Sequence, residues 1–172
     1  MRIAVTGTPG TGKTTATRRL ESRVDGYDVV HVNELIEQES LYTEIDDARD
    51  SVVADLDAIE GRLADRDDVI VESHLAHHLP ADRVAVLRCE PETLERRLRE
   101  RGESDAKARE NAESEALDVI LAEAVDRHGI DAVYEIDTTA RSPKQVADAL
   151  EAVVRGEREP SAGQVDFVGY LA

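Results

Sequence analysis

The stretch from residue 7 to residue 14, GTPGTGKT, constrains this chain more than any other part of its sequence. It matches the pattern G-x-x-x-x-G-K-S/T, and it stands between the short apolar run of residues 2–6 and a helix-like segment, residues 14–23. In such a loop the glycines let successive backbone N–H groups turn toward one anion, and the N-terminus of the following helix adds partial positive charge. The sequence therefore predicts a phosphate-binding loop between a strand and a helix.

Two residues of this loop predict its chemistry. Lys13 can reach the β- and γ-phosphates of a bound nucleotide, and the Thr14 hydroxyl can hold Mg²⁺. A glycine-rich turn that matches by accident is the alternative, and the flanking strand and helix argue against it.

Length and composition limit the remaining possibilities. A chain of 172 residues suits one α/β domain with small insertions and is too short for two such domains. There is no apolar run near 18 residues and no leader with a cleavage site, so we expect neither membrane insertion nor export. The single cysteine, Cys89, ends an apolar strand-like run, which predicts a buried structural thiol.

The net charge is −17, from 38 acidic and 21 basic residues, and only three residues are lysines. Such a surface should repel nucleic acid and anionic membranes. We interpret the excess of acidic residues as adaptation to a salt-rich cytoplasm and not as part of the protein's activity. At 1 M salt the Debye length falls to about 3 Å, and the repulsion among the acidic side chains is screened. The first twenty residues contain no Asp or Glu, so the acidity stops where phosphate must bind.

Five apolar runs rich in β-branched residues predict strands that alternate with helices. The strands are expected at residues 2–6, 27–32, 67–72, 83–89 and 132–137. The helices are expected at residues 14–23, 34–39 (with Asn33 as N-cap), 92–101, 104–128 and 143–154. This order predicts a phosphate-loop fold with a doubly wound, five-stranded parallel sheet and its ligand at the carboxyl ends of the strands.

Two further segments complete the expected chain. Residues 40–50 are expected to be irregular, and Ser51 to cap a longer amphipathic helix with Val52, Val53, Leu56, Ile59 and Leu63 on one face. The second half of the 104–128 helix should contact the core, because its first half is almost wholly polar. Residues 165–171 form a small apolar patch that we expect to dock back onto the body.

The strand ending at Glu72 delivers candidate catalytic groups. Glu72 is the strand-end carboxylate best placed to hold Mg²⁺, directly or through water, although it could be a surface residue. His74 could lie near the acceptor or an attacking water, with packing or capping as the alternative. His77 and His78 are expected to be solvated turn residues. A zinc site in HLAHH is not expected, because no cysteine or further histidine supplies the remaining ligands at a usual spacing.

The segment LERRLRERG, residues 94–102, offers arginines that can neutralise charge during phosphoryl transfer. Arg97 and Arg101 are four residues apart and share one helix face. Arg101, beside Gly102 at a predicted lid hinge, is the strongest candidate, and Lys107 and Arg109 could face the same nucleotide. A salt-bridged helix surface is the alternative for each of them.

With these residues identified, the chain resembles the adenylate kinase 6 family, the archaeal and eukaryotic nuclear adenylate kinases that are also linked to small ribosomal subunit maturation. The resemblance covers nearly the whole chain. It rests on GTPGTGKTT (7–15), ARDSVVADLD (48–57), VIVESHLAHHLP (69–80), VLRCEPETLERRLRERG (86–102), ENAESEA (110–116), IDTT (136–139) and VDFVGYL (165–171).

The resemblance implies transfer of the γ-phosphate of ATP to AMP with Mg²⁺, by a single domain spanning residues 1–172. It implies an acceptor-binding insertion at about residues 28–51 and a lid at about residues 100–110. Gly10, Thr11, Gly12, Lys13, Thr14 and Thr15 correspond to the ATP-binding loop, Arg101 to the lid arginine that contacts ATP, and Glu72 and His74 to an acidic-x-His motif.

The chain departs from the family pattern at two positions. Glu72 stands where aspartate is usual, which favours a water-mediated metal contact. Glu103 follows Gly102 where an aromatic residue is common, so we do not expect stacking on adenine there. The loop from Thr138 to Ser142 is expected to contact adenine mainly through its backbone, which would leave base selectivity loose.

Three functions are compatible with these features. A nucleoside monophosphate kinase, monomeric and cytoplasmic, in a halophilic archaeon, is the first. An ATPase that binds a small-subunit ribosomal protein on a pre-ribosomal particle is the second, and the acidic surface would suit such a basic partner. A kinase of another small metabolite is the third. A GTPase is disfavoured because the chain has no N-K-x-D motif.

Overall fold

The computed structural model describes residues 1–172, and its centre is a five-stranded parallel sheet in the order β2-β5-β1-β6-β7. The strands are β1 (Arg2–Thr6), β2 (Asp28–His31), β5 (Val69–Glu72), β6 (Arg83–Arg88) and β7 (Val133–Asp137). All four strand pairings are parallel. The predicted phosphate-loop fold with a doubly wound sheet is therefore confirmed.

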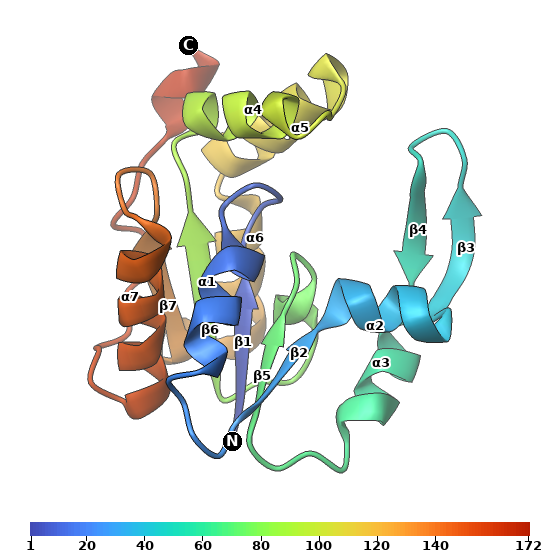
Figure 1. Cartoon of the computed structure of the whole chain (residues 1–172). Helices are drawn as coiled ribbons and strands as arrows, with labels where there is room; N and C mark the ends of the chain where they lie inside the picture. Colours follow the sequence, from blue (N-terminus) through green and yellow to red (C-terminus); the bar gives the residue numbers. More distant parts are fainter.

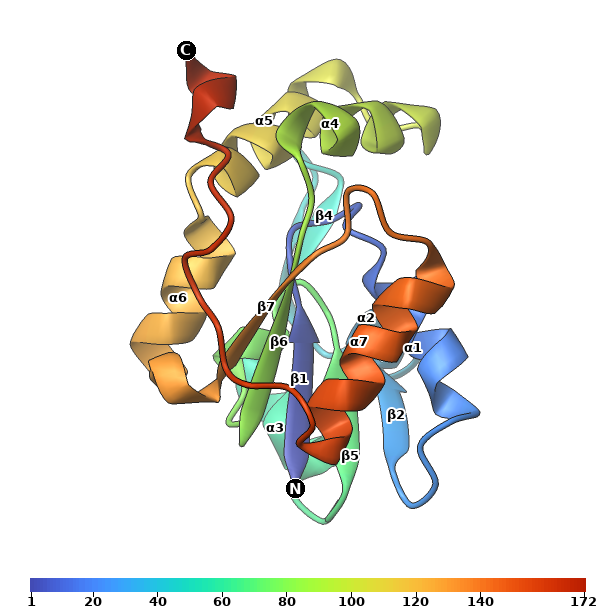
Figure 2. The same cartoon turned by 90° about the vertical axis from the view of Figure 1, so that its left-hand side faces the viewer.

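Alternate residues of β1 point to opposite faces of the sheet, and helices cover both faces (Figure 2). Ile3 and Val5 face α1 (Lys13–Glu21) and α7 (Pro143–Arg155). Ala4 faces the opposite cluster, to which α2 (Val32–Glu39), α3 (Leu56–Leu63) and α6 (Val119–His128) contribute. Burial on both faces explains why these strands read as continuous apolar runs.

The segment after β2 differs from the sequence prediction. Residues 40–55 form an antiparallel hairpin of β3 (Tyr42–Asp46) and β4 (Ser51–Ala54), which projects from the body (Figure 1). Val52 and Val53 are therefore exposed strand residues, and not the start of a helix. Helix α3 begins at Leu56, where the Asp55 side chain accepts a hydrogen bond from the Ala58 N–H at 3.0 Å.

Two other helix boundaries were also predicted wrongly. Asn33 lies inside α2, whose N-cap is His31. The long helix of residues 104–128 is two helices, α5 (Asp105–Ala116) and α6, separated at Asp118. Asp118 adopts a left-handed conformation with φ of 56°, which aspartate tolerates better than most residues, and its carboxylate binds Arg88. The break between α5 and α6 thus coincides with a contact to an arginine that is distant in the sequence.

The polar helix α5 packs against α4 (Pro91–Glu100), and both lie beyond the carboxyl ends of the strands (Figure 1). Its small residues Ala108 and Ala112 are buried, although we expected only α6 to contact the core. Cys89, Leu94, Leu98 and Ala108 form a separate small apolar cluster there.

The C-terminal tail docks onto the body, as the apolar patch predicts. Ser161 forms a parallel bridge with Tyr134 of β7, and the short helix η3 (Val168–Leu171) lies beside α5. The Tyr170 hydroxyl donates a hydrogen bond of 2.7 Å to Glu95 of α4. Short 3₁₀ helices η1 (Ala76–His78) and η2 (Ile130–Ala132) complete the fold. None of its helices is both long and apolar enough to cross a membrane.

Candidate nucleotide-binding site

The loop between β1 and α1 takes a conformation that requires glycine. Gly7, Gly10 and Gly12 have φ of 142°, 92° and 91°, which side chains rarely adopt. A Cβ on Gly7 would lie 2.4 Å from the Leu87 carbonyl oxygen, and this is a backbone atom that cannot move aside easily. The loop therefore lies against β6 and leads directly into α1, which begins at Lys13.

Lys13 folds back over this loop. Its Nζ donates to the carbonyl oxygens of Gly7, at 2.8 Å, and of Thr8, at 3.1 Å. Burial lowers the pKa of Lys13 to about 8; Glu72 opposes that shift and Arg101 adds to it. A phosphate group arriving here would favour the charged ammonium, so the site is suited to an anionic ligand.

Glu72 and Thr14 come together as potential Mg²⁺ ligands. The Thr14 hydroxyl lies 3.3 Å from both carboxylate oxygens of Glu72, which ends β5 next to β1. Both side chains offer oxygen atoms, the ligands that Mg²⁺ prefers, so the residues fit this ion. His31 was not predicted: its Nδ1 lies 2.7 Å from Glu72 Oε2 and its Nε2 lies 2.8 Å from Glu21. Burial lowers the pKa of His31, but these two hydrogen bonds outweigh it and raise the pKa.

His74, in the segment after β5, lines the same cavity as Lys13, Thr14 and Glu72. Burial lowers its pKa to about 4, and the positive charge of Lys13 adds to the shift. His74 is therefore neutral at physiological pH. It can donate or accept a hydrogen bond, but it brings no positive charge to the phosphates.

One cavity of about 720 Å³ unites these groups at the carboxyl end of the sheet. Its lining includes the predicted residues Gly10, Thr11, Gly12, Lys13, Thr14, Thr15, Glu72, His74, Arg101 and Thr138. It also includes Arg141 of the 138–142 loop, which was expected to contact adenine. Asn33, Arg97, Glu100 and Pro143 line the cavity too, and they were not selected from the sequence. Arg97 could have been selected, because it shares a helix face with Arg101. The other three carry no local pattern that indicates a ligand.

Lys107 and Arg109 do not line this cavity, contrary to our suggestion. Lys107 pairs with Glu103, and Arg109 pairs with Glu113 beside the C-terminal tail. Residues 100–110, the expected lid, form the end of α4, a turn at Gly102 and the start of α5.

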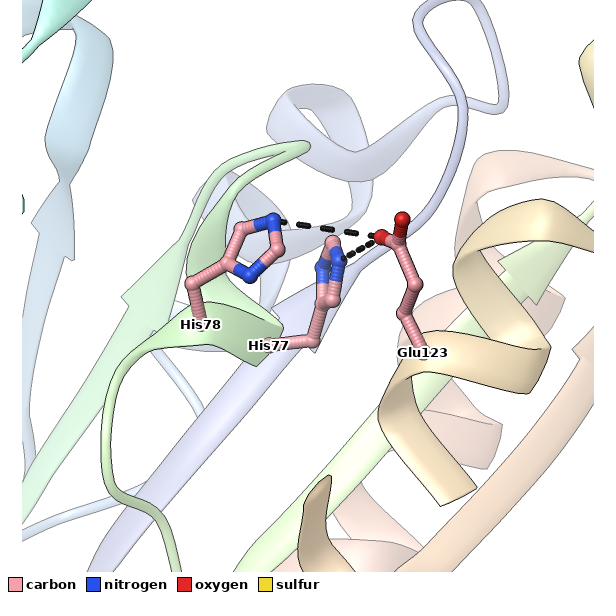
Figure 3. Close-up of side chains that lie close together, drawn as sticks. All are labelled: His77, His78 and Glu123. Atoms are coloured by element: carbon pink, nitrogen blue, oxygen red, sulfur yellow. Dashed lines mark hydrogen bonds and ion pairs between the residues drawn. The ribbon is translucent and has the colours of Figure 1, made fainter. Parts of the chain in front are cut away.

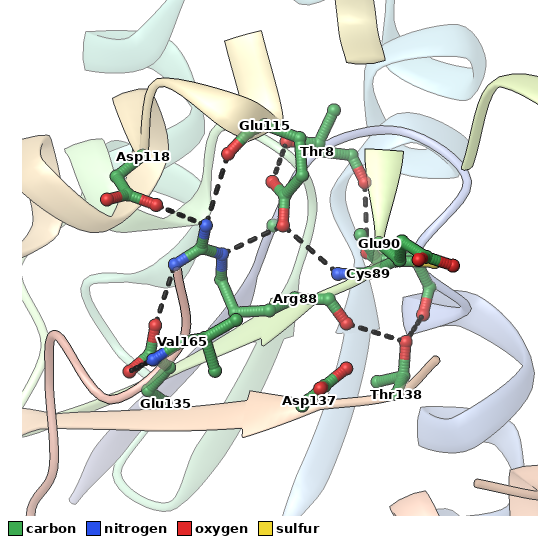
Figure 4. Close-up of polar contacts among 12 residues, drawn as sticks. Thr8, Arg88, Cys89, Glu90, Glu115, Asp118, Glu135, Asp137, Thr138 and Val165 are labelled. Atoms are coloured by element: carbon green, nitrogen blue, oxygen red, sulfur yellow. Dashed lines mark hydrogen bonds and ion pairs between the residues drawn. The ribbon is translucent and has the colours of Figure 1, made fainter. Parts of the chain in front are cut away.

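A buried arginine connects the phosphate loop to the rest of the molecule (Figure 4). Arg88, 1% exposed, donates to Glu115 at 2.8 Å, to Glu135 at 2.6 Å and to Asp118 at 2.5 Å. Glu115 also accepts from the Thr8 hydroxyl of the loop at 2.6 Å. The network thus joins the loop, the α5–α6 break and β7.

The tail extends the same network. The backbone N–H groups of Gln164 and Val165 donate to the second carboxylate oxygen of Glu135, at 2.8 and 3.4 Å. The Phe167 ring lies 5.5 Å from the Arg88 guanidinium carbon. Thr8, Arg88, Glu115, Val165 and Phe167 lie in segments that resemble the family, but nothing in the sequence indicated that they would meet, and Asp118 and Glu135 lie outside those segments.

Two smaller predictions have different outcomes. Cys89 is fully buried, and burial raises the pKa of its thiol to about 11, which confirms the structural cysteine. His77 is 1% exposed, so the expected solvated turn residue is wrong. The residue packs beneath α6 and not into solvent, because its ring nitrogens are bonded to Thr6 and Glu123.

Comparison with known proteins identifies the family of this chain. Residues 3–118 match the family described as "AAA domain". The chain belongs to the AAA domain family. A protein named "Putative adenylate kinase" from Natronomonas pharaonis is 61% identical, with 99% of this chain and 100% of that protein aligned. A protein with the same name from Halobacterium salinarum is 59% identical over the same shares, and one from Methanosarcina acetivorans is 45% identical over 90% and 86%.

Solved structures with low sequence identity share the fold of this AAA domain protein. Shikimate kinase from Bacteroides thetaiotaomicron aligns with a TM-score of 0.60 at 17% identity, covering 90% of this chain and 98% of that one. Deoxyadenosine kinase from M. mycoides aligns with a TM-score of 0.57 at 14% identity, covering 90% and 100%. These likenesses concern the architecture alone.

Proposed function

We propose that this protein is a nucleoside monophosphate kinase of the adenylate kinase 6 type, which transfers the γ-phosphate of ATP to AMP. One observation carries the proposal: a single cavity brings the phosphate loop and Lys13 together with His74, with Arg97 of α4 and with Arg101 at the end of that helix. A site that only binds nucleotide needs the loop, whereas transfer also needs cations around the migrating phosphoryl group. The names of the full-length archaeal relatives support it.

Each residue then has a role in the transfer. Residues 10–15 hold the ATP phosphates through their N–H groups and Lys13. Thr14 and Glu72 hold Mg²⁺, which neutralises phosphate charge when bound. Arg101, assisted by Arg97, neutralises charge on the transferred group. His74, being neutral, orients the acceptor through a hydrogen bond, and an AMP phosphate oxygen needs no strong general base.

We assign the acceptor side to residues 28–51 and the lid to residues 100–110. The hairpin β3–β4 supports the first assignment, because its strands have exposed residues and pair only with each other. Gly102, with φ of 91° and open space where a Cβ would lie, supports a hinge in the second. Closure of the two segments would exclude water from the phosphates. We also propose that the protein is a monomer, which leaves both segments free to move, and that it works in the cytoplasm.

A second candidate function is an ATPase that assists small ribosomal subunit maturation and rRNA processing. The net charge of −17 is compatible with it, since an acidic surface attracts a basic ribosomal protein, although salt adaptation also accounts for this charge. A kinase of another small metabolite is the third candidate, because the phosphate loop does not select the acceptor.

The test is nucleotide turnover in high salt with Mg²⁺-ATP, with and without AMP. Two ADP formed per AMP consumed is the expected result. Lys13→Ala should abolish turnover, and His74→Ala should reduce it. Lys144→Ala, which removes an exposed lysine paired with Asp148, is the matched control and should be fully active. If the rate of phosphate release from ATP does not depend on AMP and increases when a basic ribosomal protein is added, the ATPase would be the primary function.

A further inference from the structure

Three side chains that do not line the nucleotide cavity converge between η1 and α6 (Figure 3). His77 and His78 come from η1, and Glu123 comes from α6, 45 residues further along the chain. His77 Nε2 lies 2.8 Å from Glu123 Oε2, and His78 Nε2 lies 3.9 Å from the same oxygen. We propose that His77, His78 and Glu123 bind one divalent cation of the zinc class.

The donor set selects the class of metal. Two imidazole nitrogens and one carboxylate suit Zn²⁺, Co²⁺ or Ni²⁺, whereas Mg²⁺ requires oxygen ligands. Ligands about 2.1 Å from a tetrahedral zinc lie about 3.4 Å from each other. The two histidine–glutamate spacings of 2.8 and 3.9 Å bracket that value, and all three ligand atoms lie within 4.8 Å of one another, so small side-chain rotations would bring them to one ion. His78 and Glu123 are partly exposed, which leaves a fourth position for water.

A hydrogen bond to Thr6, the last residue of β1, fixes the ring of His77 in an orientation suited to metal binding. Its Nδ1 lies 2.8 Å from the Thr6 hydroxyl, and both groups are buried. A hydroxyl can donate or accept, so the proton of the ring can move from Nε2, facing Glu123, to Nδ1, facing Thr6, without displacement of the ring. The freed Nε2 lone pair then faces the metal. Metal-binding histidines have such a partner at their second nitrogen as a rule.

The backbone of His77 is also fixed, because His128 of α6 lies with its Nε2 2.7 Å from the His77 carbonyl oxygen. A bound ion would join η1 and α6 more firmly than the existing hydrogen bonds of His77 to Glu123 and His128 do, next to the segment that carries His74.

The experiment is a titration of the tag-free, EDTA-treated full chain with ZnCl₂ by calorimetry, and with CoCl₂ by visible absorption. We expect one ion per chain, intense Co²⁺ bands typical of four-coordinate geometry, and a higher Tm with Zn²⁺. Glu123→Gln and His78→Ala alter partly exposed side chains and should weaken binding at least tenfold. Asp126→Asn is the matched control: it removes one exposed carboxylate of the same helix and should bind Zn²⁺ like the wild type.

Equal Zn²⁺ affinity in the wild type and Glu123→Gln would overturn the proposal, as would six-coordinate Co²⁺ spectra that no variant changes. Displacement of Zn²⁺ by excess MgCl₂ without nucleotide would also overturn it, because Mg²⁺ prefers oxygen ligands and the ion would then lie at Thr14 and Glu72. Turnover of the metal-free Glu123→Gln variant should equal that of the wild type, since Glu123 lies outside the nucleotide cavity.

Discussion

Replacing Arg88 by methionine should destabilise the protein far more than any loss of a surface ion pair. The guanidinium is 1% exposed, and its partners Glu115 and Glu135 are 3% and 4% exposed. Removal of one member of a buried ion pair costs about 3–5 kcal/mol, because the remaining charge has no solvent to replace its partner. For a domain of this size, each kcal/mol lowers Tm by about 2–4 °C. We therefore expect Tm to fall by about 6–20 °C.

The assay is thermal and urea unfolding in buffer with high salt, which screens exposed charges and leaves buried ones nearly unaffected. Arg62→Met is the matched control, since Arg62 pairs with Glu39 at 2.5 Å but is 59% exposed. It should lose at most about 1 kcal/mol. Adding Glu135→Gln to Arg88→Met should restore part of the loss, because one of the two buried carboxylates that lose the arginine is then neutral. Equal, small losses in the Arg88 and Arg62 variants would show that burial of the charges does not control the cost.

Two further predictions concern the cavity. Gly7→Ala should abolish ATP binding measured by calorimetry, because its Cβ would lie 2.4 Å from the Leu87 carbonyl oxygen. Gly163→Ala also has a positive φ, but it meets no atom within 4 Å; it should cost about 1–2 kcal/mol and leave ATP affinity unchanged. His74 should make stability fall as the pH drops from 6.5 to 4, since the unfolded state binds a proton that the buried ring, with its pKa of about 4, does not. Urea midpoints of His74→Gln should lack this component between pH 7 and pH 5, and parallel curves would contradict it.

The central fold could be predicted from the sequence because its determinants are local. The glycines of residues 7–12 specify positive φ values, and each core strand is an apolar, β-branched run buried on both faces. Strands that alternate with helices form a parallel sheet, so the phosphate loop, Glu72 and the loop after β7 had to meet at one edge.

Prediction from local sequence patterns was wrong where one pattern is compatible with two different secondary structures. The apolar residues Val52, Val53 and Leu56 suit a helix face, yet Val52 and Val53 belong to a hairpin strand, as β-branched residues often do. Residues 104–128 read as one helix, because the break at Asp118 accompanies a contact with Arg88, 30 residues earlier.

The partners of the buried polar groups follow from the packing of distant elements. The sequence around HLAHH offers no cysteine or further histidine at a usual ligand spacing, and it does not show that α6 brings Glu123 to 2.8 Å from the His77 ring. In the same way, Arg88 meets Glu115 and Glu135 only after β6, β7 and α5 have packed. Neighbouring residues are enough to specify the strands, the helices of the sheet layers and the phosphate loop. Pairings between distant side chains depend instead on strand order and helix packing, which no local pattern encodes.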